Sequence, residues 1–246
     1  MASDRLPRRT ILALVAIAGL TVLLDVLFGG DEGVRTDGGE EWRAVRTVSL
    51  PTPNEVGDRS VEEAVTARRS RREYGERALS RRELGQLLWA AQGVTDRASG
   101  HRAAPSAGAL YPLELYVVIG TSGVVDLESG VYRYRPTTHE LARGKAGEFQ
   151  SELRAAALDQ RAVEEAAVDI VVCAVDERMT GTYGERGRRR YVPMEAGHVG
   201  ENLYLQAESL ALSTVAIGAF DDDRVRAVVG APSGQRPLYV FPVGAR

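Results

Sequence analysis

The sequence has almost no cysteine, histidine or lysine, and each shortage excludes a kind of chemistry. Cys173 is the only cysteine, so the chain cannot form an internal disulfide. It lies in the apolar run 168–175, where a buried, inert thiol is expected rather than a nucleophile. The 3 histidines, His101, His139 and His198, have no metal-ligand spacing to one another, so no metal site is expected.

Lys145 is the only lysine, and arginine supplies nearly all of the basic charge. A phosphate group in this protein would therefore be held by arginine side chains or main-chain amides. The formal net charge of −3 gives no general basic field, so no nucleic-acid partner is expected. With 44% hydrophobic and 26% charged residues, the composition is that of an ordinary globular protein.

The N-terminal part of the chain has the pattern of a membrane anchor. A short segment, 1–9, carries arginines and is followed by a mostly apolar segment, 10–28. Positive charge before the segment and acids after it predict a single-pass helix with the rest of the chain on the extracytoplasmic side. A cleaved signal peptide is the alternative, although no small-x-small cleavage site follows Phe28.

Residues 29–57 are rich in glycine, proline and acids, which predicts a linker. The alternative is an arm that wraps around the folded domain, with Trp42 as its docking point. The folded domain is expected over 58–246.

Within that domain, the capping boxes Ser60-x-x-Glu63 and Ser80-x-x-Glu83 each predict the start of a helix. Further helices are expected over 146–158, over 193–212, and from a cap at Asp221 to 229. Strands are expected over 113–119, 131–135, 168–175, 214–220 and 238–243. Helices and strands mix without a strict β-α-β repeat, which favours an α+β fold with one sheet packed between helices.

Two stretches have the residue types of a ligand site. Four arginines, Arg68, Arg69, Arg71 and Arg72, surround Ser70, and a phosphate would relieve their mutual repulsion. The alternative is a solvated helix end in which Glu73 and Glu76 are the partners.

The stretch 104–112 is the second candidate. Ala107, Gly108 and Ala109 remove side-chain bulk, so that a flat ligand could approach the main chain, and Ser106 adds a hydroxyl. An apolar strand follows at once, an arrangement typical of a binding loop, while an ordinary turn is the alternative.

Together these motifs carry a resemblance to a known family. In order they are Arg-Arg-Ser-x-Arg, Pro-Ser-Ala-Gly-Ala-Leu-Tyr-Pro, Glu195-Ala196-Gly197-His198 and Ile217-Gly218-Ala219-Phe220. The chain resembles the nitroreductase superfamily of FMN enzymes, and within it the SagB/ThcOx-type peptide azoline dehydrogenases. The resemblance covers 60–246.

The resemblance implies a three-layer α+β fold, a central and mostly antiparallel sheet flanked by helices, and a homodimer that holds FMN at its interface. It assigns the FMN phosphate and pyrimidine edge to Arg68, Arg69, Ser70 and Arg72. It places Pro105, Ser106, Ala107 and Gly108 along the flavin ring, and Ile217, Gly218 and Ala219 on the opposite side of that ring. Small residues suit a flat ring and arginines suit a phosphate, so the residue chemistry agrees.

One departure from the family pattern concerns the catalytic pair. Azoline oxidases of this branch carry Lys-Tyr where this chain carries Thr182-Tyr183. Tyr183 could still donate or accept a proton, and it is the catalytic candidate. Threonine cannot replace the lysine, which places azoline oxidation in doubt. The arginines at 186 and 188–190 nearby could meet an acidic substrate, but an exposed charged loop is favoured.

The sequence therefore predicts an FMN-dependent oxidoreductase that transfers hydride between FMN and a small-molecule or peptide substrate, with NAD(P)H as a candidate donor. The alternative function is a catalytically inactive, membrane-tethered flavin-binding sensor or scaffold. Apolar residues spread over more than one face of the helix predicted at 193–212, so that a second subunit could cover one of these faces. The central helix of a monomer is the alternative that this pattern also allows, and the family resemblance favours the homodimer.

Overall fold

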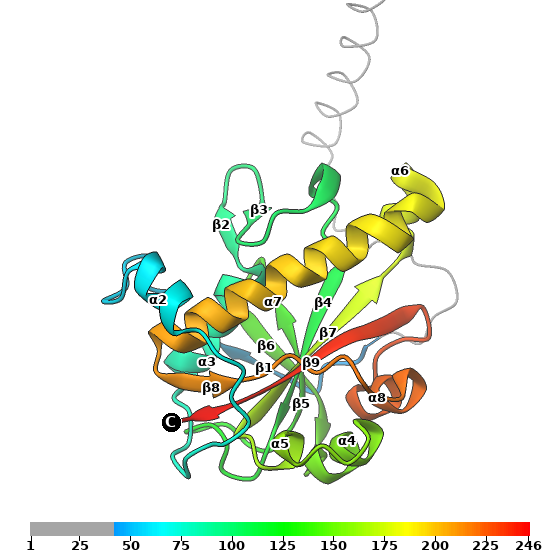
Figure 1. The fold of residues 1–246 in the computed structure, drawn as a ribbon. Helices are drawn as coiled ribbons and strands as arrows, with labels where there is room; N and C mark the ends of the chain where they lie inside the picture. The colour runs from blue at the N-terminus through cyan, green and yellow to red at the C-terminus, as the bar shows by residue number, and fades with distance from the viewer. Residues whose placement is uncertain (1–41) are drawn as a thin grey trace, which may run out of the picture. The chain divides into compact units, whose positions relative to one another are not determined.

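The computed structural model describes residues 42–246, which form one large antiparallel sheet covered by helices (Figure 1). The sheet has seven strands in the order β1-β6-β5-β4-β7-β9-β8, and each neighbouring pair is antiparallel. Its strands are β1 (Arg46–Ser49), β4 (Leu113–Ile119), β5 (Gly130–Arg135), β6 (Glu140–Ala146), β7 (Val168–Val175), β8 (Leu212–Thr214) and β9 (Gln235–Ala245). A separate hairpin pairs β2 (Val94–Asp96) with β3 (His101–Arg102).

Helices lie on both faces of the sheet, which gives the three layers that the resemblance implies (Figure 1). The helices are α2 (Val61–Ala67), α3 (Arg81–Gln92), α4 (Gln150–Ala156), α5 (Arg161–Glu164), α6 (Glu177–Arg186), α7 (Val192–Ser209) and α8 (Asp222–Val229). Side chains of α3 and α7 pack on one face, and those of α4, α5 and α8 pack on the other.

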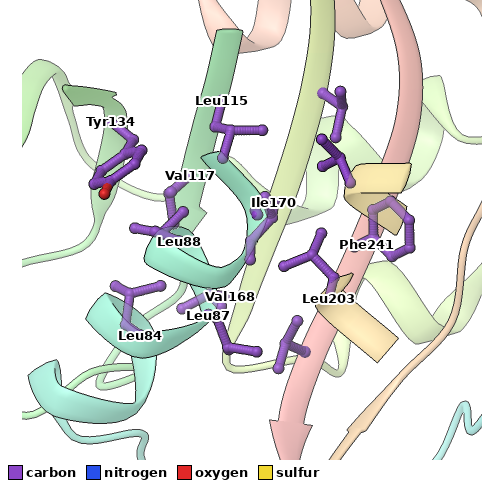
Figure 2. Packing of buried hydrophobic residues seen from close by; sticks show 14 of the residues in the cluster. Leu84, Leu87, Leu88, Leu115, Val117, Tyr134, Val168, Ile170, Leu203 and Phe241 are labelled. Carbon is purple, nitrogen blue, oxygen red and sulfur yellow. The ribbon is translucent and has the colours of Figure 1, made fainter. Parts of the chain in front are cut away.

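The central strands are buried on both faces because their side chains alternate between two cores. In β4, Leu115 and Val117 enter the core under α3 and α7, whereas Tyr116 and Val118 enter the opposite core. Figure 2 shows the first core, where leucines of α3 meet β4 and β7. Cys173 of β7 is fully buried in the second core, and this burial raises the pKa of its thiol.

The local signals for helix ends are confirmed. Ser60 Oγ accepts a hydrogen bond from the Glu63 N–H at 3.1 Å, and the Glu63 carboxylate accepts from the Ser60 N–H at 2.8 Å. The box at Ser80 begins α3 in the same way. Asp221 caps α8, and Gly230 ends it in the left-handed region at φ 66°, which a glycine adopts without strain.

Three sequence-based element boundaries are wrong. The helix predicted over 146–158 begins at Gln150, because strand β6 pairs with β5 as far as Ala146. The helix predicted over 193–212 ends at Ser209, and Ala211 follows at φ 55°. The strand predicted over 214–220 ends at Thr214, since the Ala216 N–H donates to the Tyr204 hydroxyl at 2.8 Å instead of to a strand.

The linker predicted over 29–57 is wrong in its described part, where the arm alternative holds. Residues of β1 pair with β6, and the Trp42 ring packs edge-on against Tyr116 with 5.1 Å between centroids. The sheet therefore begins well before residue 58. The anchor predicted over 10–28 lies outside the described residues. Among residues 42–246, no helix is both long enough and apolar enough to cross a bilayer.

Candidate functional site

The arginine cluster after α2 gathers around the phenol of Tyr204, which projects from α7. Ser70 Oγ and Tyr204 Oη lie 2.9 Å apart and share a hydrogen bond. The Arg68 guanidinium lies over the Tyr204 ring, 5.1 Å from its centroid. This stacking holds one arginine of the predicted phosphate site in place and leaves the edge of its guanidinium available to a ligand.

The four arginines do not share one role. Arg71 lies 3.7 Å from the buried carboxylate of Glu208, so its charge is met within the protein. Arg69 folds back and donates to the carbonyls of Thr66 and Arg68, at 3.0 and 2.7 Å. Neither Arg68 nor Arg72 forms an ion pair with any carboxylate of residues 42–246, Glu73 and Glu76 included.

The segment that follows β8 runs past the same tyrosine. Besides contacting Ser70, Tyr204 Oη accepts from the Ala216 N–H. Ile217 is buried and exchanges two 2.9 Å hydrogen bonds with Val240. Gly218 and Ala219 are exposed, and within the described part of the chain their N–H groups have no hydrogen-bond partner. The predicted phosphate arginines and the predicted ring-facing amides thus belong to one set around Tyr204.

The loop over 104–112 forms a second set and has a strained backbone. Gly108, Ala109 and Tyr111 have φ values of 64°, 53° and 45°, a region that residues with a side chain seldom enter. Ser106 Oγ accepts from the Tyr111 N–H at 2.9 Å, which helps to hold this shape. Strain of this kind persists only where surrounding contacts enforce it, and it is common at binding sites.

Tyr183, the catalytic candidate, comes from α6 and lies directly against this loop. A Cβ built on Gly108 would stand 2.8 Å from the Tyr183 hydroxyl, so only glycine leaves room for the phenol. The ring of Tyr183 packs edge-on against Tyr191, with 5.0 Å between centroids. The structure therefore brings the catalytic candidate to the segment predicted to lie along the flavin.

A buried carboxyl group supports the loop from α7. Glu195 is 1% exposed, and its Oε1 accepts from Gln92 Nε2 at 3.2 Å. Its Oε2 is buried without a hydrogen-bond partner among the described residues. Burial raises the pKa of Glu195, while the nearby Ser106 hydroxyl and the hydrogen bond from Gln92 partly offset that effect. Glu195 belongs to the motif over 195–198, but the motif alone assigns it no role; the available sequence signal is an acid on the inward face of an amphipathic helix.

The two sets contact α7 at different places. His198 Nδ1 lies 3.2 Å from the Pro105 carbonyl oxygen, whereas the other set surrounds Tyr204. Six residues of α-helix separate these contacts by about 9 Å along the axis and about 120° around it. The structure thus groups Ser70 with 216–219, and Tyr183 with 105–108, on separate faces of one helix.

One side of α7 has no cover from the described part of its own chain. Met194, Gly197, His198 and Glu201 recur at helical spacing and are exposed, and Met194 is 48% exposed despite its apolar side chain. The helix is therefore not buried all round within one chain. Its open side includes His198, next to the strained loop.

The arginines after Tyr183 do not form the loop expected for them. They continue α6 into a π-helical turn over 187–191, which leads directly into α7. Arg189 donates to Glu185 at 2.8 Å and Arg188 to Asp176 at 3.1 Å, so much of this charge is met locally.

Comparisons with known proteins identify the family and agree with the observed fold. Residues 65–245 match the model of the nitroreductase family. The chain is 43% identical over 199 residues to MJ1384 of Methanocaldococcus jannaschii, named as a nitroreductase, which covers 81% of this chain and 96% of that protein. It is 29% identical over 150 residues to the microcin B17-processing protein McbC of Escherichia coli, covering 60% of this chain and 55% of McbC. A nitroreductase structure from Ralstonia eutropha superposes with a TM-score of 0.71 at 26% identity, covering 87% of this chain and 97% of that one.

Proposed function

This chain belongs to the nitroreductase family, and on that premise we propose that it is an FMN-dependent oxidoreductase of the SagB/ThcOx type. Its reaction would be hydride transfer between bound FMN and a small-molecule or peptide substrate. The flavin supplies the redox chemistry when bound, and the chain's own residues bind it, orient it and position a proton.

One observation carries this proposal: Arg68 and Arg72 lack carboxylate partners in the described structure beside Ser70, in the same set as two exposed main-chain N–H groups. Arginine forks and a hydroxyl suit a phosphate dianion. Exposed amides at Gly218 and Ala219 suit the polar edge of a flavin ring. Arg69 is the weakest of the proposed ligands because its side chain caps the end of α2.

The loop over 105–108 would contact the flavin from a second copy of the chain. Within one chain it lies on a different face of α7 from the phosphate set, and the side of α7 beside it is exposed. A homodimer packed through that side would cover Met194 and bring the loop of one protomer toward the phosphate set of the other. Sedimentation of the purified protein tests this, and a monomer that retains FMN would contradict it.

The substrate is proposed only by class. Tyr183 is the residue that we propose to donate or accept a proton, and its hydroxyl lies against Gly108. The name of McbC, a microcin-processing protein, supports a peptide as one candidate. Thr182 cannot act as the lysine of azoline oxidases does, which favours a different reaction on a peptide or a small molecule. NAD(P)H is the proposed donor.

The test begins with the purified full chain, which should be yellow and hold about one FMN per chain. NAD(P)H should reduce the flavin, and a nitroaromatic or a quinone should reoxidise it. A colourless protein that FMN does not stabilise against heat would overturn the proposal. A flavin that dithionite reduces but that passes electrons to no acceptor would instead favour the sensor or scaffold.

Attachment to a membrane through 10–28, with the catalytic domain on the extracytoplasmic side, also stays a proposal. It is supported by the arginines before the apolar segment and the acids after it. Fractionation of cells that express the full chain tests it. Release of a shortened soluble form would indicate a cleaved signal instead.

A further inference from the structure

A cavity of about 510 Å³ lies beside the strained loop, on the side where Tyr111 ends it. Residues from β3, the start of β4, the end of β5 with its turn, and α6 line this space, which is open to solvent on one side. None of the residues assigned above to FMN lines it.

The lining of this cavity is unbalanced in charge. Four of its residues are arginines, Arg102, Arg133, Arg135 and Arg178, and the only acid is Glu114, which leaves three positive charges in excess. The Glu114 side chain is 9% exposed and accepts from Arg133 Nε at 3.0 Å and from Arg178 Nη2 at 2.5 Å. Each oxygen of the Glu114 carboxylate therefore already accepts a hydrogen bond from an arginine. No carboxylate within residues 42–246 pairs with Arg102 or Arg135.

Arg102 is held in place by neutral groups only. Its Nη1 donates to Gln92 Oε1 at 3.0 Å, and its guanidinium stacks on the Tyr111 ring, 4.6 Å from the centroid. Burial and the nearby charge of Arg178 lower the pKa of Arg102, although the negative charge of Glu114 partly offsets them. A half-buried cation among like charges is relieved by an anion in the same space.

We propose that this cavity is an oxyanion site, which takes the carboxylate or phosphate group of a small molecule. Guanidinium forks match both groups in geometry, and the hydroxyls of Thr137 and Thr138 in the turn after β5 add donors to the lining. Binding does not depend on flavin chemistry, because the cavity is separate from the residues assigned to FMN.

Arg102 and Arg178 also contact the loop over 104–112, so an anion bound in the cavity would affect the conformation of that loop. Arg178 Nη1 donates to the Tyr111 carbonyl at 2.9 Å, and the Arg102 main-chain N–H donates to the Tyr111 hydroxyl at 3.1 Å. The Arg102 guanidinium also stacks on the Tyr111 ring, so an anion bound between Arg102 and Arg178 would fix both groups against Tyr111 and reinforce its φ of 45°. The cavity is thus a place where a charged part of a substrate, or a separate small anion, can act on the loop.

Calorimetric titration of the full chain with pyrophosphate and, separately, with tricarballylate tests the site at constant ionic strength. The background carries Arg72→Gln, which weakens the other oxyanion cluster. Adding Arg135→Gln should raise the dissociation constant of at least one probe about tenfold, the effect of losing one hydrogen bond to a charged group. Adding Arg82→Gln, an exposed arginine of α3 outside the cavity, is the matched control and should change it less than twofold.

The two probes distinguish a phosphate from a carboxylate preference. Absence of binding at millimolar probe would overturn the proposal, as would binding that Arg135→Gln and Arg82→Gln change equally. Both measurements report anion affinity whether or not FMN binds, so failure here is distinct from failure of the proposed oxidoreductase function.

Discussion

Two groups of candidate site residues contact α7, one around Tyr204 and one in the loop over 104–112, and they differ in how far the protein itself satisfies them. Around Tyr204, two arginines lack an acid partner and two amides are exposed, so the described structure leaves donors for a ligand to satisfy. In the loop over 104–112, internal hydrogen bonds and packing against Tyr183 already enforce a strained backbone. The first set should therefore gain stability from a bound anion, whereas the second is preorganised by the protein itself.

Removing the arginines near Tyr204 that lack a carboxylate partner among the described residues should have the largest effect, a loss of FMN affinity. The double change Arg68→Gln and Arg72→Gln should weaken FMN binding at least 100-fold, since each charge-assisted hydrogen bond is worth about 1.5–3 kcal/mol. Arg71→Gln is the matched control, because Arg71 pairs with Glu208. It should leave FMN affinity within a few-fold. Fluorescence titration with FMN measures all three proteins, and equal losses from Arg71→Gln would contradict the division of roles.

Adding a side chain at Gly108 should have the next largest effect, a loss of unfolding free energy. Gly108→Ala adds a Cβ at φ 64°, 2.8 Å from the Tyr183 hydroxyl, and should cost about 1–3 kcal/mol of unfolding free energy. Combining it with Tyr183→Phe removes the clashing oxygen and should recover part of that loss. Urea unfolding of both single variants and the double variant measures the coupling. Strict additivity would show that the loop is not held by Tyr183.

Tyr204→Phe tests the hydrogen bonds that hold Ser70 and the segment after β8 around the Tyr204 hydroxyl. It removes the phenol oxygen that accepts from the Ala216 N–H and contacts Ser70. Leaving a half-buried N–H without a partner should cost about 1–2 kcal/mol. FMN affinity should fall as well, because Ser70 loses its orientation. Unfolding curves with and without FMN separate the two effects; a drop in stability with unchanged affinity would place the site elsewhere.

Glu195→Gln should have the smallest effect, and its signature is the dependence of stability on pH. The pKa of Glu195 is raised in the folded state above its ordinary 4.5, so the folded chain binds the extra proton. Its contribution to stability is therefore largest at low pH and is lost as the pH rises from 4.5 through the folded pKa. The glutamine variant should lack this loss and be more stable than the wild type above that range.

Asp169 complicates that measurement, because burial raises its pKa well above the ordinary value and gives a loss of the same sign. Asp169→Asn is therefore measured beside Glu195→Gln. Identical pH profiles for the wild type and Glu195→Gln would show that the pKa of Glu195 does not differ between the folded and the unfolded chain.

How far the sequence could predict the structure depends on the range of the contacts involved. The caps at Ser60, Ser80 and Asp221 are made by residues within a few positions, and all three are where the sequence places them. Strand β6 was missed although β5 is its hairpin neighbour, because its residues show no strand-like alternation of apolar and polar side chains and its other partner, β1, is about 90 residues away in sequence. Its pairing, rather than its residue propensity, determines its conformation.

The same reasoning applies to the candidate site. The arginines around Ser70 were recognisable as a cluster, but their division between Glu208, the end of α2 and open space depends on the fold. Likewise, the sequence can suggest that Glu195 lies on an inward helix face, but its contacts with Gln92 and Ser106 depend on the fold. Motif order predicts the candidate ligands, and long-range packing decides which of their polar groups are left without a partner among the described residues.

The burial of the only cysteine has a practical consequence for studying the proposed dimer. Because Cys173 is fully enclosed in the second core and its thiol is hard to ionise, a maleimide or nitroxide reagent should leave the native chain unlabelled. A cysteine introduced at Glu201, on the open side of α7, would then be the one reactive thiol in the described structure. Spin labels attached there would report the distance between two protomers directly, without prior removal of a native cysteine.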